Sequence, residues 1–265
     1  MLVSNTLFGE LDKVQIAIAR IKEFEPPEGY YVAFSGGKDS VVILDLVKRS
    51  GVKFDAHYHF TGVDPPELYS FIHNEHSEIS IDKPRITMWK LIEHKLMPPT
   101  RIIRYCCKEL KEHGGKDRVV ITGVRAAESV LRSKRGVVSH CYKQSNKFTV
   151  NPIVDWTDKD VWQYIKENNV KYCHLYDEGF KRLGCIGCPM GNKKQRVQQF
   201  LRWPKFEKMY RKAFENAVIA RVAKGEIWNA AHPLKEDWSS GDKMFDWWMQ
   251  DKHLKGNPDQ STMFE

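Results

Sequence analysis

The chain has 265 residues, and its 42 Lys and Arg against 34 Asp and Glu give a formal net charge of +8. That length suits one large α/β domain, or one domain with a substantial extension. A content of 42% hydrophobic and 12% aromatic residues allows a sizeable core, which excludes a wholly disordered chain. The mean hydropathy is −0.53, and no apolar run approaches the roughly 18–20 residues of a membrane span. Because the chain starts without a basic region followed by an apolar core, we expect no secretory signal and a cytoplasmic protein.

Strand and helix patterns alternate from about residue 30. Strands are predicted over residues 30–34, 53–60 and 118–122, and helices over residues 41–49 and from about Glu67. Strands that alternate with helices favour a parallel, twisted sheet with right-handed crossovers. We therefore predict an α/β, Rossmann-like fold with helices on both faces of the sheet.

Two further helical patterns follow the third strand. Residues 157–169 predict a capped helix, with Thr157 as N-cap and Asp160 reaching back in a variant of the capping box. Beyond Pro189, one long basic helix is predicted through about Lys224. The last forty residues are rich in Trp but weakly periodic, so no regular structure is predicted there.

The string SGGKDS lies between the first predicted strand and the first predicted helix, and comprises Ser35, Gly36, Gly37, Lys38, Asp39 and Ser40. Glycine permits positive φ and close approach of the backbone to a ligand, and free amides at a helix start favour an anion. Lys38 can neutralise a phosphate, and the two serines can donate hydroxyl hydrogen bonds. These features predict a phosphate-binding loop; a simple glycine turn is the alternative.

Asp39 is the unexpected member of this loop, because a carboxylate beside a phosphate repels it unless a cation lies between them. A Mg²⁺ ion would resolve this repulsion. The two glycines lack the four intervening residues of a Walker A loop, which disfavours an ordinary P-loop NTPase. We therefore expect a phosphate site that uses Mg²⁺ but differs from a Walker A site.

The loop and three later strings resemble known families. SGGKDS after a first strand resembles the loop of the N-type ATP pyrophosphatases, the adenine nucleotide α-hydrolase superfamily. Within it, TGVDPPELYSFI, NPIVDWTDKDVWQYI and LYDEGFKRLGCIGCP are similar to segments of phosphoadenylyl-sulfate (PAPS) reductase-like proteins, over about residues 30–192. The resemblance implies that residues 35–40 and Gly123 bind the pyrophosphate of ATP. It also implies that the enzyme transfers AMP to an acceptor oxygen, with Lys38 and Asp39 in catalytic roles.

The cysteines suggest a metal or redox site, because six are too few for a disulfide scaffold. Cys106 and Cys107 are adjacent, and Cys185 and Cys188 form a C-x-x-C pair. Adjacent ligands fit a tetrahedral zinc site less readily than a larger iron–sulfur cubane; zinc or buried apolar cysteines stay open as alternatives. The pattern resembles that of adenylyl-sulfate reductases and related sulfur-transfer pyrophosphatases, which implies a 4Fe–4S cluster on all four.

Two cysteines, Cys141 and Cys173, lie outside this pattern and are interpreted as incidental core or surface thiols. Assimilatory reductases of the resembled family use a nucleophilic cysteine in a C-terminal tail, whereas no cysteine follows Cys188 here. Without such a thiol an S-sulfo-enzyme intermediate cannot form in that way. Reduction of PAPS or adenylyl sulfate is therefore the second hypothesis, behind acceptor adenylation followed by sulfur insertion.

The string GVRAAES follows the third predicted strand and adds candidate charge clamps. Arg125 and Arg132 are candidates to hold the α-phosphate or the acceptor, and Glu128 is a candidate to orient them. Lys38 with Mg²⁺ would stabilise the pyrophosphate as charge develops on it. The alternative for these charged residues is a solvated helix start.

A basic segment carries the whole net charge. Between Lys193 and Lys224, ten Lys and Arg accompany only Glu207 and Glu215, which gives this window a net charge of +8. Basic side chains between aromatic ones suit a nucleic-acid backbone and its bases. An amphipathic helix with solvated cations and its aromatic residues in the core is the alternative. The aromatic residues are Phe200, Trp203, Phe206, Tyr210 and Phe214.

Together these patterns predict a PAPS reductase-like ATP pyrophosphatase domain with an iron–sulfur site over residues 1–192, and a basic helical extension over residues 193–265. The predicted function is sulfur incorporation into nucleic acid, with DNA phosphorothioation ahead of tRNA thiolation. The expected cofactors are ATP, Mg²⁺ and a 4Fe–4S cluster. Expected partners are DNA or tRNA and a cysteine desulfurase or other persulfide donor, with no membrane and with homo-oligomerisation left open. A non-catalytic nucleotide- and cluster-binding subunit is the third hypothesis.

Overall fold

The computed structural model describes residues 2–6, 9–112, 114–140, 148–225 and 238–250. The chain divides into two compact units, each described by itself below. Unit 1 comprises Met1–His59, Pro66–Asp82 and His113–Leu183, and unit 2 comprises Phe60–Pro65, Lys83–Glu112 and Gly184–Glu265. Among the described helices, none is both long enough and apolar enough to cross a membrane.

Unit 1 is built on a six-stranded sheet with the order β5-β4-β3-β6-β8-β7. The strands are β3 (Tyr30–Ala33), β4 (Phe54–His59), β5 (Ser80–Asp82), β6 (Val119–Ile121), β7 (Val138–His140) and β8 (Phe148–Val150). Neighbouring strands are parallel except β7, which runs antiparallel to β8 at the edge of the sheet. A separate antiparallel pair joins β1 (Val3–Thr6) to β2 (Gly9–Asp12).

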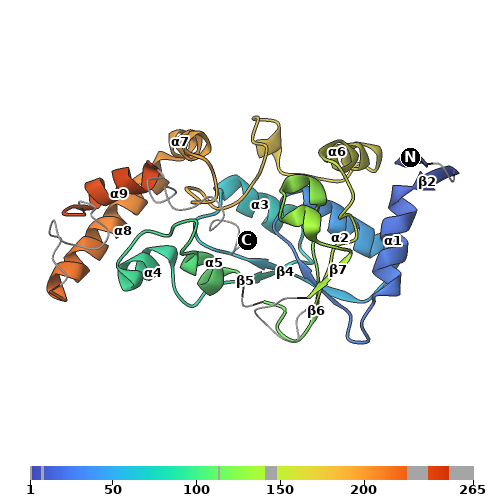
Figure 1. The fold of residues 1–265 in the computed structure, drawn as a ribbon, viewed down its shortest axis with the longest axis horizontal. Coiled ribbons are helices and arrows are strands. Elements are labelled where there is room, and N and C mark those ends of the chain that lie inside the picture. Colours follow the sequence, from blue (N-terminus) through green and yellow to red (C-terminus); the bar gives the residue numbers. More distant parts are fainter. Residues whose placement is uncertain (1, 7–8, 113, 141–147, 226–237, 251–265) are drawn as a thin grey trace. The chain divides into compact units, whose positions relative to one another are not determined.

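The helices of unit 1 accompany this sheet in the alternating order that the sequence predicts. They are α1 (Lys13–Glu23), α2 (Lys38–Ser50), α3 (Pro66–Glu75) and α6 (Asp158–Glu167), with three 3₁₀ turns at η1 (Ala126–Glu128), η2 (Arg132–Lys134) and η3 (His174–Tyr176). In Figure 1, α1 lies beside α2, and α2 also contacts α6. The predicted α/β, Rossmann-like fold is confirmed, and among the described strands of this sheet only β7, at the edge, departs from the parallel arrangement.

The strand order creates the position at which a ligand can bind. Strand β3 lies at the centre, and β4 and β6 flank it on opposite sides. The chain therefore leaves β3 toward β4 in one direction and returns to β6 in the other. In open α/β sheets, ligands bind at the carboxyl ends of the strands where the order switches in this way. The loop after β3 and the segment after β6 meet at this point.

Unit 2 is helical. Its helices are α4 (Met88–Lys95), α5 (Tyr105–Leu110), α7 (Lys193–Arg202), α8 (Pro204–Ala223) and α9 (Gly241–Met249). Helix α8 packs against both α4 and α9. Its core is aromatic, because Phe200, Tyr210, Phe214 and Trp248 are each at most 4% exposed and their rings contact one another.

The prediction of one long helix beyond Pro189 is wrong. The chain forms α7 and α8, with a break at Trp203, whose backbone leaves the helical region at φ −127° and ψ 69°. Pro204 explains the break, because proline lacks the amide hydrogen and disfavours a helical conformation in the residue before it. Proline is well suited to the first turn of the next helix, where it stands in α8. Helix α9 was also missed, in a segment for which no regular structure was predicted.

Unit 2 unites segments from both sides of position 192, since it contains the cysteine-bearing stretches together with the C-terminal helices. These units are defined by contacts within the chain and not by family boundaries. The domain limits of 1–192 and 193–265 therefore stay a prediction.

The N-terminus of α6 confirms the predicted capping box. The Thr157 hydroxyl accepts a hydrogen bond from the amide of Asp160 at 3.2 Å, and the Asp160 carboxylate accepts one from the amide of Thr157 at 2.8 Å. These two bonds satisfy amides that have no partner within the helix.

We expect Thr157→Ala to lower the free energy of unfolding by about 1 kcal/mol, because the hydroxyl that caps α6 is lost. Thr157→Ser keeps that hydroxyl and is the matched control. Urea denaturation of the two variants and the wild type measures the effect. Equal destabilisation by Ser and Ala would show that the methyl group matters and the cap does not.

A polar cluster lies on one side of strands β3, β4 and β5. His57 is held between two carboxylates, with Nε2 at 2.7 Å from Asp55 and Nδ1 at 2.9 Å from Asp82. The Arg118 guanidinium donates to Asp55 at 2.5 Å. Burial alone would raise the pKa of Asp55, but hydrogen bonds from Arg118 and His57 outweigh it and hold that pKa below its ordinary value.

This shift predicts an acid-sensitive contribution to stability. Because the folded-state pKa of Asp55 lies below the unfolded one, its contribution is present above about pH 4 and is lost as the pH falls through the folded-state pKa. We expect Asp55→Asn to lose less stability than the wild type between neutral pH and acid. Urea unfolding at a series of pH values tests this, and parallel losses in the two proteins would contradict it.

Candidate functional site

The SGGKDS loop connects β3 to α2 and uses its glycines for geometric reasons. Gly36 has φ +70°, and a Cβ there would lie 2.6 Å from Leu68 Cδ1 and 2.8 Å from Ile72 Cδ1. Only glycine therefore fits between this turn and α3 without displacement of those side chains. Gly37 is the N-cap of α2 and provides no side-chain cap, which leaves the first amides of the helix unsatisfied by a capping side chain.

The two serines hold the loop in shape. The Ser40 hydroxyl donates to the Gly37 carbonyl at 2.8 Å, and the Ser35 hydroxyl donates to Ser40 Oγ at 3.2 Å. The Ser35 amide also donates to Ser40 Oγ at 3.3 Å. Ser40 is buried, so in this structure both hydroxyls serve the loop itself.

Lys38 and Asp39 lie at the start of α2 among charged partners. Lys38 is 8% exposed, and its Nζ lies 3.2 Å from Asp39 Oδ2 and 3.4 Å from Asp158 Oδ1. The Lys38 amide donates to the hydroxyl of Tyr176 at 2.8 Å. An anion that binds the Lys38 amide would therefore have to replace the Tyr176 hydroxyl as its hydrogen-bond acceptor.

Arg125 is the buried centre of this group. It is 1% exposed, and its Nε donates to Asp39 at 2.7 Å while Nη2 donates to Asp158 at 2.5 Å. Its Nη1 donates to the carbonyl of Trp156 at 3.3 Å. Burial alone would lower the pKa of Arg125, but the two carboxylates raise it, so the guanidinium stays charged.

The structure brings Gly123 to the same place. A Cβ at Gly123 would lie 2.8 Å from the carbonyl oxygen of Asp39, so the segment after β6 can approach the loop after β3 only with glycine there. Gly123, Lys38, Asp39 and Arg125 are therefore neighbours, as a shared site requires. Their predicted roles in catalysis and cofactor binding stay predictions.

Arg132 and Glu128 form a second layer of this segment. The Glu128 carboxylate accepts from the backbone amide of Arg125 at 2.9 Å and pairs with the Arg132 guanidinium. Glu128 thus contacts the backbone of Arg125 and the side chain of Arg132, and its role in orienting them stays a prediction. Arg132 is partly exposed, and no described contact joins it to the loop.

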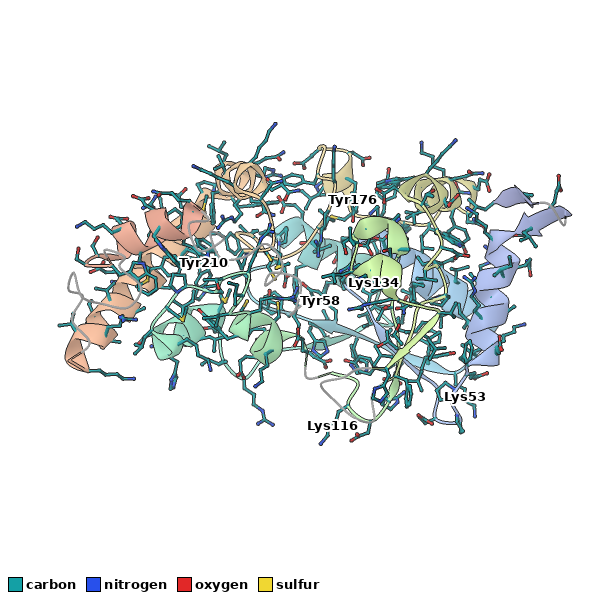
Figure 2. All side chains as sticks on the ribbon, viewed as in Figure 1. Lys53, Tyr58, Lys116, Lys134, Tyr176 and Tyr210 are labelled. Carbon is teal, nitrogen blue, oxygen red and sulfur yellow. The ribbon has the colours of Figure 1, made fainter. Side chains whose placement is uncertain are left out.

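Sequence reasoning missed two members of the site, Asp158 and Tyr176. Asp158 is the first residue of α6 and bridges Arg125 and Lys38. Tyr176, labelled in Figure 2, lies in η3, and its hydroxyl accepts a hydrogen bond from the Lys38 amide. Both residues stand in strings that carried the family resemblance, so a signal was present, but only the fold assigns them to the phosphate loop.

The four cysteines of the predicted cluster all belong to unit 2. Cys106 is buried and Cys107, Cys185 and Cys188 are half-buried, all as free thiols. A hydrogen bond between neighbouring thiols lowers the pKa of Cys107 to about 6 and raises that of Cys106, which the charges of Cys185 and Cys188 raise further. Cys107, Cys185 and Cys188 are therefore each close enough to Cys106 to raise the pKa of its thiol.

Cations and a buried carboxylate surround these thiols. Burial alone would lower the pKa of Lys111, but the charges of Cys185, Asp64 and Cys188 outweigh it and raise that pKa. The pKa of Arg104 is likewise raised, because the charge of Cys107 outweighs the effect of burial. Asp64 is 5% exposed, and its carboxylate accepts from the Thr61 amide at 2.9 Å and the Thr61 hydroxyl at 2.7 Å.

The TGVD string therefore contributes to the cysteine site. Thr61 Oγ1 lies 3.7 Å from Cys185 Sγ, and Asp64 Oδ1 lies 3.8 Å from the same sulfur. This role of Thr61 and Asp64 was missed from the sequence, although their string was singled out. In the described part of the chain, no group of three or more His, Cys, Asp or Glu side chains is arranged to hold a single metal ion.

Of the two cysteines outside the predicted cluster, the structure describes only Cys173. Cys173 is buried in unit 1, where burial raises the pKa of its thiol, as an incidental core cysteine would show. Cys141 lies outside the described residues.

The predicted nucleic-acid segment divides into buried and exposed parts. Phe200, Trp203, Tyr210 and Phe214 are at most 6% exposed, so their rings pack in the core of unit 2 and are not available to bases. Arg196 is also buried, with its guanidinium 5.1 Å from the centre of the Trp248 ring. Several lysines of α8 remain exposed. Whether this segment binds nucleic acid stays a prediction.

Comparison with known proteins identifies the family. A family model described as the phosphoadenosine phosphosulfate reductase domain matches residues 29–191. The adenosine 5′-phosphosulfate reductase of Oceanobacillus iheyensis is 30% identical over 167 residues, which cover 59% of this chain and 69% of that protein. An uncharacterized protein of Methanocaldococcus jannaschii is 32% identical over 167 residues, covering 59% of this chain and 40% of the relative. The chain thus spans less than half the length of that relative.

A solved structure supports the fold. The PAPS reductase from Candida auris, in a phosphate complex, matches with a TM-score of 0.51 and 21% identity, over 66% of this chain and 88% of that one. At this identity the likeness concerns the fold alone. With the family match over more than half of its length, the chain belongs to the phosphoadenosine phosphosulfate reductase domain family.

Proposed function

We propose that this chain is an ATP pyrophosphatase that adenylates an acceptor oxygen for sulfur incorporation. The observation that carries the proposal is the pairing of two cations, Lys38 and Arg125, with two carboxylates, Asp39 and Asp158, at the start of α2. A site with balanced charges has little attraction for a bare polyphosphate. It suits a nucleotide that arrives with a metal cation, because carboxylates then face the cation and basic groups face the phosphates.

The donor set at this loop fits Mg²⁺. That ion binds through one or two carboxylates together with phosphate oxygens and water, and Asp39 and Asp158 supply two carboxylates beside the same guanidinium. Asp158 is 73% exposed at its side chain and therefore accessible to an incoming metal–nucleotide complex. When bound, Mg²⁺ would neutralise charge on the phosphates.

The protein residues would then position and stabilise the reaction. An acceptor oxygen attacks the α-phosphorus, a new phosphorus–oxygen bond forms, and the bond to the β-phosphate oxygen breaks with pyrophosphate as the leaving group. The Lys38 side chain would stabilise the charge that develops on pyrophosphate, and the Lys38 amide would do so once a phosphate oxygen replaces the Tyr176 hydroxyl. The terminal sulfur of a donor persulfide, such as that of a cysteine desulfurase, then attacks the activated centre, and AMP leaves with the acceptor oxygen. A thiol reductant then cleaves the sulfur–sulfur bond that still joins the product to the donor, which releases the thiolated product and leaves the donor sulfur in a disulfide.

We further propose that the acceptor is a nucleic acid, with DNA phosphorothioation ahead of tRNA thiolation. The net charge supports this, because the segment from Lys193 to Lys224 carries all of the +8 and the rest of the chain is balanced. A polymeric phosphate acceptor benefits from such a basic region more than a small nucleotide does.

The four thiols support a 4Fe–4S cluster in unit 2. Four cysteines, three of which lie within electrostatic reach of the fourth, Cys106, match the number of ligands that such a cluster uses, and a cubane has wider ligand spacing than a single ion. Arg104 and Lys111 would offset the negative charge of thiolate ligands. When bound, the cluster would supply electron transfer or a site for sulfur.

A second candidate function is reduction of a sulfonucleotide. The names of the Oceanobacillus iheyensis, Salinibacter ruber and Geobacillus kaustophilus relatives favour it, since each is an adenosine 5′-phosphosulfate reductase. The two functions differ in their products, because reduction releases sulfite from the sulfonucleotide and adenylation releases pyrophosphate from ATP.

We expect pyrophosphate release from ATP and Mg²⁺ in the presence of DNA or tRNA, and a drop of about 100-fold in kcat/KM in Lys38→Ala, because a charge that stabilises the leaving group is lost. Lys48→Ala is the matched control, since Lys48 lies in the same helix but pairs with Glu78 on the surface. The assay runs DNA, tRNA and adenylyl sulfate in parallel. Sulfite from adenylyl sulfate without pyrophosphate from ATP would favour the reductase and overturn the proposal.

For the cluster, we expect an anaerobic preparation to be brown, with blue-violet absorbance and about four irons and four sulfides per chain. Cys185→Ser should bleach it. Cys173→Ser is the control, because this cysteine lies in unit 1 and outside the ligand set. A colourless protein with stoichiometric zinc would refute the assignment, whatever the outcome of the ATP assay.

A further inference from the structure

A groove with a volume of about 300 Å³ lies in unit 2 along helices α4 and α8. Its lining residues are Trp89 from α4 and Lys205, Lys208, Met209, Lys212, Ala213 and Asn216 from α8. The α8 positions recur at spacings of three and four residues, so they form one stripe along the helix. No carboxylate stands among the lining residues, and three of them are lysines.

The three lysines of the groove are exposed. Lys205, Lys208 and Lys212 make no ion pair or hydrogen bond with any residue that the structure describes. Arg211, in the same helix, behaves differently: its guanidinium pairs with Glu207 at 2.9 Å and with Asp242 at 2.7 Å. Helix α8 therefore has one side on which its positive charge is neutralised and another on which it is not. An anionic occupant complements the second side.

Trp89 gives the groove an aromatic wall. Its ring meets the ring of buried Tyr210 edge-on, with centroids 5.1 Å apart, which anchors the indole against the core of unit 2. The side chain stays half-buried and lines the groove on its other side. The lysine stems and Met209 complete a largely apolar floor, on which a flat ring can rest.

We propose that this groove binds single-stranded nucleic acid, with backbone phosphates on the three lysines and an unstacked base against Trp89. From Lys205 to Lys212 the helix rises about 10 Å, the length of about three stacked nucleotides. The strand must be single because paired bases are not free to stack on a side chain. An acidic peptide would satisfy the lysines but leave the indole without a planar partner.

This inference deepens the proposed function, on which it rests for its biological role, by naming the surface that takes the polymeric acceptor. It also revises the aromatic part of the sequence prediction. Four of the five rings of the basic segment are core, and the fifth, Phe206, is half-buried but does not line the groove. The ring that lines the groove comes from α4, more than 100 residues earlier in the chain.

To test the proposal, fluorescence anisotropy measures the binding of a labelled oligothymidylate of roughly 12 nucleotides to the full chain at a series of salt concentrations. The triple variant Lys205→Gln, Lys208→Gln, Lys212→Gln should weaken binding about 100-fold at 0.1 M salt. The magnitude of the slope of log binding constant against log salt concentration should also fall by about 2, because three phosphate contacts to a single strand are lost. Trp89→Leu should weaken binding about tenfold with the slope unchanged, because it removes stacking and no charge.

The matched control is Lys22→Gln, Lys116→Gln, Lys159→Gln, which removes the same charge from exposed lysines of unit 1; Lys116 is labelled in Figure 2. It should leave both affinity and slope near the wild-type values. An equal loss in the control and the groove variant would mean diffuse charge attraction and overturn the proposal. Tighter binding of duplex DNA, or full displacement by polyglutamate of matched charge, would overturn it as well.

The pyrophosphate assay on the same variants separates this inference from the proposed function. If oligonucleotide binding depends on the groove but ATP releases no pyrophosphate, the groove proposal stands and the proposed pyrophosphatase activity is refuted. Pyrophosphate release with no groove-dependent binding would retain the enzyme and refute the groove.

Discussion

The arrangement of unit 1 depends on the pairing of the buried Arg125 guanidinium with two carboxylates. A charge that is 1% exposed is stable only when it is paired, because the cost of leaving it unpaired in a low-dielectric interior exceeds most single contributions to folding. Its partners come from separate elements: Asp39 at the start of α2, Asp158 at the start of α6, and the Trp156 carbonyl before α6. This pairing holds the segments that follow β3, β6 and β8 together at the carboxyl ends of the strands.

The same pairing joins structure to the proposed chemistry. Arg125 and Lys38 share Asp158 and Asp39, so the groups that would contact a nucleotide are those that hold the loop in place. A preorganised set of charges loses little when a ligand binds, since its side chains are already ordered. The Tyr176 hydroxyl on the Lys38 amide adds a neutral partner that an anion can replace.

In unit 2, one buried ring connects two surfaces of different chemistry. Tyr210 is fully buried and donates its hydroxyl hydrogen to the Ile186 carbonyl at 3.0 Å, beside the C-x-x-C pair. Burial raises its pKa, and the charges of nearby Cys185 and Cys106 raise it further. Its ring also supports Trp89 at the groove. Tyr210 therefore packs between the cysteine site and the lysine stripe of the same helix.

The sequence by itself determined the features that depend on neighbouring residues. The capping box at Thr157 and the helix break at Pro204 are local, because each follows from backbone conformation and hydrogen bonds within a few positions. The break was overlooked although its signal was present. Tertiary structure alone decided which segments meet: that β6 lies beside β3, that Asp158 and Tyr176 join the loop, that Arg196 is buried, and that Trp89 lines the groove. These contacts join residues far apart in the chain, and packing selects them through burial and charge pairing that no local pattern encodes.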